Sequence, residues 1–373
     1  MERRYDLDWL RVIAFALLIF YHIGMFFVPW NWHVKNNIQY TWLEYPMTFL
    51  NRWRMPLLFI ISGMGMAFSL RKRTAAQFSV ERIIRLLVPL IFGILVIVPP
   101  QVYIERLVND QFVGSYLNFW SLTVDEILLF GNFSWHHLWF IPYILAYSLI
   151  LIPVCKYFII KPDNSFVRYV TKLSHSKWGL YWLVLPLFLM ESFLDPFFPI
   201  THGLVDDWYN FTYNLVLFFY GFVLIIVGKP FFETAGKYFK SYLLVGIIFF
   251  SVFMFIVKNF EDGWQRHFIE AAVNQINMWS WLLALFGLAS VYLNRKSSVI
   301  IYCNTAVYPF YILHQTVIVV LAYFLMNKQL NLFAKFSLLV LGTLVVCWLL
   351  YDLLIKRFSI LRLFMGLKFK KRK

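Results

Sequence analysis

The segment RVIAFALLIFYH at residues 11–22 places two ionisable side chains at the ends of an apolar run. Arg11 carries a fixed positive charge, and His22 carries a ring whose ordinary pKa, about 6.5, suits proton transfer near neutral pH. Eleven helical residues make three turns plus about 20°, so both side chains point along one face, roughly 16 Å apart. Such a helix could hold an anion at one end and accept a proton at the other.

Two further ionisable side chains are predicted to lie at the depth of His22. Depth is estimated from the helical rise of about 1.5 Å per residue and a hydrocarbon core about 30 Å thick. His22 then lies roughly 22 Å from the inner boundary, Arg54 roughly 25 Å and His314 roughly 21 Å. His136 and His137 are expected at the outer interface. We therefore expect a donor-rich group of side chains in the outer third of the membrane.

A second polar set is predicted near the cytosolic boundary. Arg11 lies about 6 Å into the core, and Arg82 and Arg85 lie about 3 to 8 Å into it. Ser62 and Gly63 fall between the two sets, where small residues allow helices to approach closely.

Structural roles remain open for these residues. A single intramembrane histidine can donate a hydrogen bond between helices, and the inner arginines can be anchors whose charged ends reach the interface. His33 and His136 fit an interfacial role better than a catalytic one. Most of the Trp and Tyr excess fits the aromatic belts of a membrane protein.

The elements that must position these side chains are membrane helices. Of the 373 residues, 61% are hydrophobic and 14% are charged, and the mean hydropathy is +0.67. In lipid, backbone groups need internal partners, so only helices or closed barrels can span. Apolar runs of about 20 residues fit helices, whereas barrel strands alternate. We predict an all-α integral membrane protein with a single domain, residues 1–373.

Ten spans are predicted, at residues 7–28, 50–70, 80–99, 137–157, 178–194, 208–228, 240–258, 272–293, 300–326 and 333–356. The longest loop, 100–136, is expected to hold a short interfacial or re-entrant segment. Most of the 34 basic residues fall in alternate loops, which predicts that both termini are cytosolic. The net charge of +15 then reflects topology and lipid contact, with the tail KFKKRK on anionic headgroups, and no nucleic acid is expected.

The three cysteines, Cys155, Cys303 and Cys347, lie in or beside apolar runs without metal-binding or redox spacing. We interpret them as small core residues and expect no metal site.

Several short segments stand in a defined order along the chain. Arg11 and His22 have ten residues between them in the first span, and LDWLRV at 7–12 leads into it. MPLLFIISGM at 55–64, ERIIRLLVP at 81–89, HLWFIPYIL at 137–145 and YPFYILHQTVIV at 308–319 follow. Together these segments resemble the membrane-bound acyltransferase family 3, whose hallmark matches Arg11 and His22 and whose lead-in matches LDWLRV. The last two segments resemble its glucan-biosynthesis branch, whose members are polysaccharide O-acyl- or succinyltransferases. The resemblance covers the whole chain, and ten spans is the family's number.

The resemblance implies transfer of an acyl group, acetyl or succinyl, from cytosolic acyl-CoA to a hydroxyl of a glycan or small acceptor at the outer side of a bacterial cytoplasmic membrane. Acyl-CoA is then a co-substrate, and membrane lipids are partners. A homodimer is possible. His22 matches the family's essential histidine and Arg11 its essential arginine.

We expect His22 to act as general base towards the acceptor hydroxyl, or alternatively to be acylated transiently. Arg54 or His314 would stabilise charge on the thioester oxygen. CoA phosphates would be held by arginine forks, and the pantetheine arm would pass Ser62. The arginines concerned are Arg11, Arg82 and Arg85.

Two other functions remain open. A secondary transporter or flippase for a glycan or anionic substrate could also line its path with Arg and His, although no internal repeat is visible. A structural membrane subunit of a glycan-synthesis complex would need neither His22 nor a donor.

Overall fold

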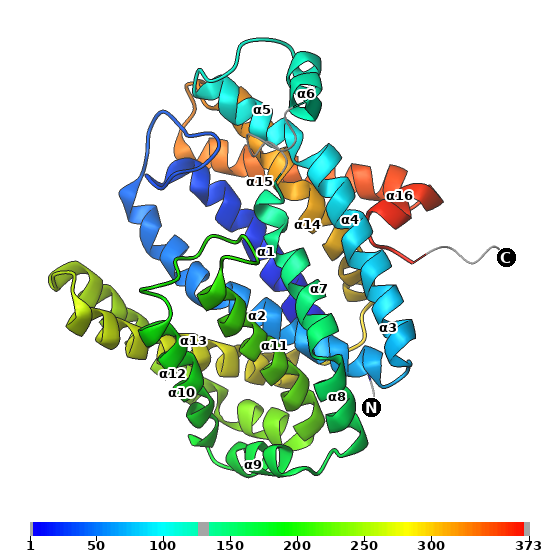
Figure 1. Cartoon of the computed structure of the whole chain (residues 1–373). Helices are drawn as coiled ribbons and strands as arrows, with labels where there is room; N and C mark the ends of the chain where they lie inside the picture. The colour runs from blue at the N-terminus through cyan, green and yellow to red at the C-terminus, as the bar shows by residue number, and fades with distance from the viewer. Residues whose placement is uncertain (1–2, 126–133, 369–373) are drawn as a thin grey trace. The chain divides into compact units, whose positions relative to one another are not determined.

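The structure is a computed structural model that describes residues 3–125 and 134–368, and in those residues every regular element is a helix (Figure 1). Among them, seven helices are long and apolar enough to cross a membrane, and the bent pair His136–Ile150 and Ile152–Ile160 makes up to eight. The predicted all-α, multi-span architecture is confirmed. The tail at residues 369–373 lies outside the described residues.

The chain divides into two compact units. Unit one comprises residues 1–14, 49–80 and 143–301, and unit two comprises residues 15–48, 81–142 and 302–373. The single-domain assignment stays a prediction.

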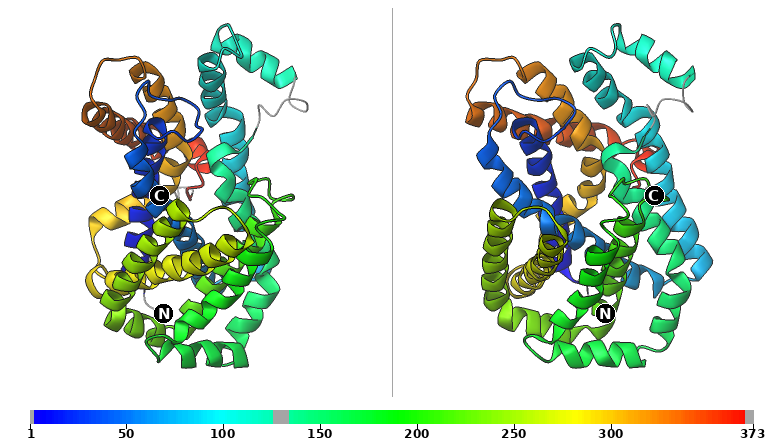
Figure 2. Two further views of the ribbon diagram at one scale, coloured as in Figure 1. Left: turned by 90° about the vertical axis from the view of Figure 1, so that its left-hand side faces the viewer. Right: turned by 60° about the vertical axis from the view of Figure 1, so that its left-hand side comes forward.

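Unit one contains the start of α1 (Tyr5–Phe27), most of α2 (Glu44–Leu70) and most of α7 (Phe140–Ile150). It continues through α8 (Ile152–Ile160), α9 (Ser165–Ser174), α10 (Val184–Phe193), α11 (Trp208–Val227), α12 (Lys229–Asn259) and α13 (Trp264–Tyr292). The last two helices lie side by side (Figures 1 and 2) and bury Phe253, Ile256 and Val273 in one cluster.

α13 is long enough to cross a membrane, with 29 residues, yet it is too polar to rank with the candidate spans. Its polar side chains are buried and bonded to protein: Asn274 and Gln275 donate to the Glu191 carboxylate, and Asn277 donates to the Gly246 carbonyl. Paired polar groups inside a bundle lower the mean hydropathy without facing lipid. The predicted spans 178–194 and 272–293 correspond to the shorter apolar helix Gly179–Phe193 and to α13, and the total of ten stays a prediction.

Two glycines allow α2 and α11 to approach closely. A Cβ added to Gly63 would lie 1.8 Å from the Phe218 carbonyl oxygen, and one added to Gly221 would lie 2.0 Å from the Ile60 carbonyl oxygen. The predicted packing role of Gly63 is confirmed.

Unit two contains the rest of α1, α5 (Pro99–Val108), α6 (Tyr116–Asp125), most of α14 (Ser298–Leu325), α15 (Leu332–Leu349) and α16 (Ser359–Phe364). Four of these helices share one apolar core. Its buried members include Ile23 and Phe26 from α1, Ile104 from α5, Ile318 from α14 and Leu339 from α15.

The third predicted span is longer than expected. α3 (Ala75–Arg82), α4 (Val88–Phe92) and α5 follow one another through π-helical turns at Ile83–Leu87 and Gly93–Ile97. The loop predicted from residue 100 was wrong for residues 100–108, because Pro99 and Pro100 open α5 and do not end the helical run. Proline suits a first helical turn, where its missing N–H would have no intrahelical partner. The short helix α6 lies within residues 100–136, and its interfacial or re-entrant placement stays a prediction; residues 126–133 lie outside the described residues.

Candidate active site

His22 on α1 and His314 on α14 form a hydrogen-bonded pair inside unit two. His22 Nδ1 lies 2.8 Å from His314 Nε2, and the two ring centroids are 5.0 Å apart. The similar depths predicted for these residues are thus matched by direct contact. His314 is 1% exposed, which fixes its ring among protein atoms.

The Tyr311 carbonyl settles which nitrogen of each ring carries a proton. His314 Nδ1 lies 2.7 Å from this oxygen, which can only accept, so Nδ1 must be the protonated nitrogen. With both rings neutral, His314 Nε2 accepts from His22 Nδ1–H. The basic lone pair of His22 is therefore on Nε2.

His137 also contacts the part of α14 that carries His314, through Tyr311 and Ile312. The Tyr311 hydroxyl donates to the His137 carbonyl at 2.6 Å, and His137 Nε2 donates to the Ile312 carbonyl at 3.1 Å. The His137 ring packs edge-on against His314 with centroids 5.3 Å apart. His137 is a buried residue of this site, and its expected depth at the outer interface stays a prediction.

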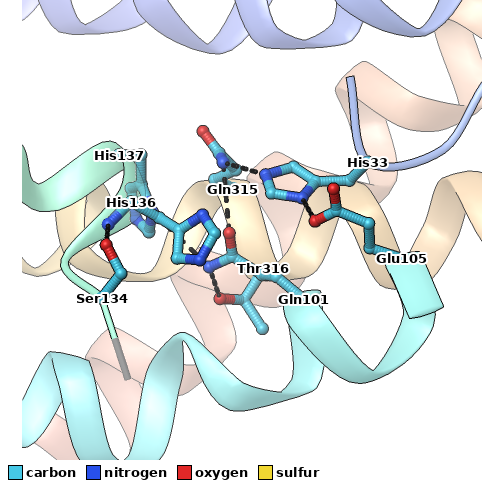
Figure 3. Close-up of polar contacts among 8 residues, drawn as sticks. All are labelled: His33, Gln101, Glu105, Ser134, His136, His137, Gln315 and Thr316. Carbon is cyan, nitrogen blue, oxygen red and sulfur yellow. Dashed lines mark hydrogen bonds and ion pairs between the residues drawn. The ribbon is translucent and has the colours of Figure 1, made fainter. Parts of the chain in front are cut away.

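A chain of polar contacts continues from His137 across unit two (Figure 3). The Gln101 amide Nε2 lies 3.5 Å from His137 Nδ1 and 2.6 Å from Thr316 Oγ1. Gln315 Nε2 then donates to Gln101 Oε1 at 3.1 Å. Both glutamines are buried, so this is an internal network.

The far end of the network is a histidine–carboxylate pair (Figure 3). Gln315 Nε2 lies 2.9 Å from His33 Nε2, and His33 Nδ1 lies 2.5 Å from Glu105 Oε2. The ring of His136 packs 5.4 Å from that of His33. We call the connected residues Glu105, His33, Gln315, Gln101 and His137 the outer network.

Sequence reasoning missed most of the outer network. Gln315 directly follows His314, and Gln101 and Glu105 are four residues apart, which places them on one helix face. That face was hidden because residues 100–136 were expected to form a loop.

Arg11 belongs to unit one, where it lines a cavity of about 390 Å³. One acidic side chain, Asp8, and five basic ones line this cavity, which we call the basic cavity: Arg3, Arg4, Arg11, Arg71 and Lys72. Its volume falls in the range of small-molecule sites. Arg3 donates to Asp8 Oδ2 through Nε at 3.0 Å and Nη2 at 2.9 Å, which leaves a surplus of positive charge. The cavity suits a phosphate-bearing ligand.

The other predicted site residues lie outside these two groups. Arg54 is in unit one, on α2, and is 3% exposed. Its predicted meeting with His22 and His314 stays a prediction, because those residues belong to unit two. The Ser62 hydroxyl donates to the Leu58 carbonyl of its own helix at 2.8 Å.

Arg82 and Arg85 belong to unit two and do not line the basic cavity. Arg85 is exposed; its Nε donates to the Gly366 carbonyl at 3.1 Å, and its Nη1 lies 3.5 Å from Glu81. Within the part of the chain that the structure describes, no group of three or more His, Cys, Asp or Glu side chains could hold a metal ion.

Comparison with known proteins gives a family. A model of the acyltransferase-3 type, described as an acyltransferase domain, matches residues 4–352. Curated relatives include "Glucans biosynthesis protein C" of Salmonella schwarzengrund (strain CVM19633) and of Salmonella typhi, each 23% identical over 226 residues. The protein of the same name from Salmonella paratyphi A (strain ATCC 9150 / SARB42) is 22% identical over the same length.

Each of these matches covers 60% of this chain and 57% of the relative, so the chain spans little more than half the length of these relatives. No solved structure matches the chain. Because the acyltransferase domain covers nearly all of its length, this multi-pass membrane protein belongs to the acyltransferase-3 family.

Proposed function

We propose that this acyltransferase moves an acetyl or succinyl group from cytosolic acyl-CoA to a hydroxyl of a glycan or small acceptor at the outer side of a bacterial cytoplasmic membrane. Membership of an acyltransferase family supports the reaction class. The name of the relatives, which refers to glucans, supports a polysaccharide acceptor. The proposal includes ten spans, with both termini cytosolic.

The observation that carries the proposal is the hydrogen bond from His22 Nδ1–H to His314 Nε2 at 2.8 Å. In this tautomer His22 Nε2 carries the basic lone pair, and we assign to it the proton of the acceptor hydroxyl, whose oxygen attacks the thioester carbon. The new C–O bond forms as the C–S bond breaks, and His22 returns the proton to the departing thiolate. General base catalysis of this kind contributes about 10²- to 10⁴-fold.

The same tautomer bears on which group stabilises the developing oxyanion. In neutral His314, Nδ1–H is directed to the Tyr311 carbonyl and Nε2 accepts from His22. His314 then has no hydrogen for the thioester oxygen. Arg54, which is buried and permanently charged, is the stronger of the two predicted candidates.

The basic cavity of unit one is the proposed site for the CoA phosphates. Arg11 lines it, and Arg3, Arg4, Arg71 and Lys72 extend the predicted set. The N-terminus of α1, which begins at Tyr5, adds a positive helix end beside these residues. Arg82, Arg85 and Ser62 stay proposed contacts of the donor outside the lining of this cavity.

The test is acyl transfer by purified protein in proteoliposomes. Free thiol is measured after addition of acetyl-CoA or succinyl-CoA with candidate glycan acceptors, and acylated product by mass spectrometry. His22→Ala is expected to lower turnover at least about 100-fold. The matched control is His175→Ala, which changes an exposed histidine of unit one.

Two outcomes would overturn the proposal. If His22→Ala keeps wild-type turnover, His22 is not the base. If wild-type protein carries glycan across the bilayer without thiol release, it is a transporter or flippase.

A further inference from the structure

When the histidine rings of the outer network are neutral, the donor and the acceptor of each of its hydrogen bonds are fixed, and we call this order the direction of the network. The direction is fixed because groups that can only accept lie at both ends. At one end the Ile312 carbonyl requires a proton on His137 Nε2, so His137 Nδ1 is an acceptor. At the other end the ionised Glu105 carboxylate requires a proton on His33 Nδ1, so His33 Nε2 is an acceptor.

The two glutamines can satisfy both ends in only one way. Gln101 must turn its NH₂ group to His137 Nδ1 and Thr316, which leaves its Oε1 as an acceptor. Gln315 must then use one N–H for Gln101 Oε1 and the other for His33 Nε2, as Figure 3 shows. Every donor along the chain faces an acceptor, so the arrangement is fully matched.

Reversal of either amide breaks this match. A Gln315 turned by 180° would present its oxygen to two acceptors, Gln101 Oε1 and His33 Nε2. To restore the bonds, Gln101 would also have to turn, and both His137 Nδ1 and His33 Nε2 would need a second proton on their rings. Buried unmatched polar groups are costly, so the direction is held cooperatively.

This network fixes the part of α14 that carries His314. Tyr311, Ile312, Gln315 and Thr316 all bond to residues of the network or, through the Thr316 hydroxyl, to the Ile97 carbonyl at 2.6 Å. His314 lies between them in the sequence. We propose that Gln315 and Gln101, oriented by the Glu105–His33 pair, are positioning residues that hold His314 Nε2 on His22 Nδ1.

The role inferred is positional rather than proton conduction, and it rests on the proposed function. The proton that His22 removes from the acceptor hydroxyl ends on the CoA thiol, so the reaction leaves no net proton to export. A fixed base geometry does matter, since displacement of a catalytic group by about 1 Å can cost about 100-fold in rate.

Isosteric exchanges can separate the direction of the network from its charge. Glu105→Gln keeps an acceptor oxygen for His33 Nδ1–H, so the direction survives. Gln315→Glu removes both N–H donors, so Gln101 has to turn its NH₂ group towards the new carboxylate. His33 then lies between two carboxylates and has to carry a proton on both nitrogens. The double variant Glu105→Gln/Gln315→Glu keeps the wild-type charge but reverses the direction at His33.

We expect Gln315→Glu to lower kcat about 100-fold with little change in the KM for acyl-CoA. Glu105→Gln should lower kcat much less than Gln315→Glu does, and the double variant should have a kcat as low as that of Gln315→Glu. The matched control is Gln111→Glu, an exposed glutamine of unit two, which should behave as wild type. Thermal unfolding of each variant checks that the fold is retained.

Recovery of wild-type kcat in the double variant would overturn the proposal, since charge alone would then suffice. Wild-type kcat in Gln315→Glu would overturn it as well. The tautomer of His33 gives a readout independent of acyl transfer. Nitrogen-15 NMR should find Nδ1–H in the wild type and Nε2–H in the double variant, and Nε2–H in the wild type would refute the direction. Absence of thiol release by wild-type protein would instead refute the proposed function.

Discussion

At the scale of single residues, the tautomer of His22 on α1 is determined by His314, which lies on another helix, α14. The Tyr311 carbonyl orients His314, and His314 Nε2 then accepts a hydrogen bond from His22 Nδ1–H. What His314 must supply is an acceptor at the position of Nε2. This requirement distinguishes its role from that of a second base.

Replacement of His314 by glutamine and by leucine tests this requirement. The Gln Oε1 atom can occupy the place of Nε2 and accept from His22, whereas Leu fills a similar volume without an acceptor. We expect His314→Leu to lower kcat at least about tenfold and His314→Gln to retain clearly more activity. Equal losses in the two variants would show that His314 acts in some other way.

Lys35 gives a second prediction at this scale, outside the membrane spans. Its ammonium group donates to carbonyls around the end of α1, those of Met25, Val28 and Trp30. Burial lowers the pKa of Lys35 from 10.5 to about 8. The folded state therefore binds fewer protons than the unfolded state between about pH 8 and 10.5, and the contribution of Lys35 to stability rises with pH across that window.

The measurement compares thermal unfolding of wild type and Lys35→Met from pH 7 to 10. The wild type should gain stability relative to the variant as pH rises above 8. Parallel pH profiles would contradict the lowered pKa.

At the scale of elements, the sequence predicted the helices better than their ends. The apolar runs were sufficient to locate α1, α2, α11, α12, α14 and α15, since lipid-facing helices have to be apolar over about 20 residues. The third helical run was cut short at Pro99. This cut concealed Gln101 and Glu105, because a proline inside an apolar run has the same sequence signal whether it ends a helix or begins one.

The crossing of α2 and α11 gives a prediction for an element. Gly63→Ala would place a Cβ 1.8 Å from the Phe218 carbonyl oxygen, a backbone atom that cannot rotate away. We expect a loss of about 1–3 kcal/mol of stability, measured as a lower unfolding temperature in detergent. Gly65→Ala on the same helix is the matched control, because its Cβ would meet only Arg11 Nη2, at an ordinary 3.6 Å. Equal stability of both variants would refute the tight crossing.

At the scale of the whole molecule, composition and the length of the apolar runs predicted an all-α membrane protein, and helix depth predicted that His22 and His314 lie at a similar depth. The outer network could not be predicted in the same way. Its members come from positions 33, 101, 105, 137 and 315, and amide pairs of this kind depend on contacts between helices that no local periodicity records. The depth estimate also grouped Arg82 and Arg85 with Arg11. The basic cavity that contains Arg11 is instead lined by residues near the start of α1 and the end of α2.

The number of spans can be tested by the side of the membrane on which two loops and the start of α12 lie. With ten spans, Gly179–Phe193 and α13 cross the membrane, so residues 195–207 and 260–263 are external and Lys237 is cytosolic. Without those two crossings, all three positions change sides. Single cysteines are introduced at Val205, Glu261 and Lys237, all exposed, after Cys155, Cys303 and Cys347 are replaced by alanine. A membrane-impermeant maleimide should label Val205→Cys and Glu261→Cys in intact cells and Lys237→Cys only after permeabilisation. The opposite pattern would establish eight spans and refute the ten-span topology, because α13 would then lie outside the bilayer with its polar side chains.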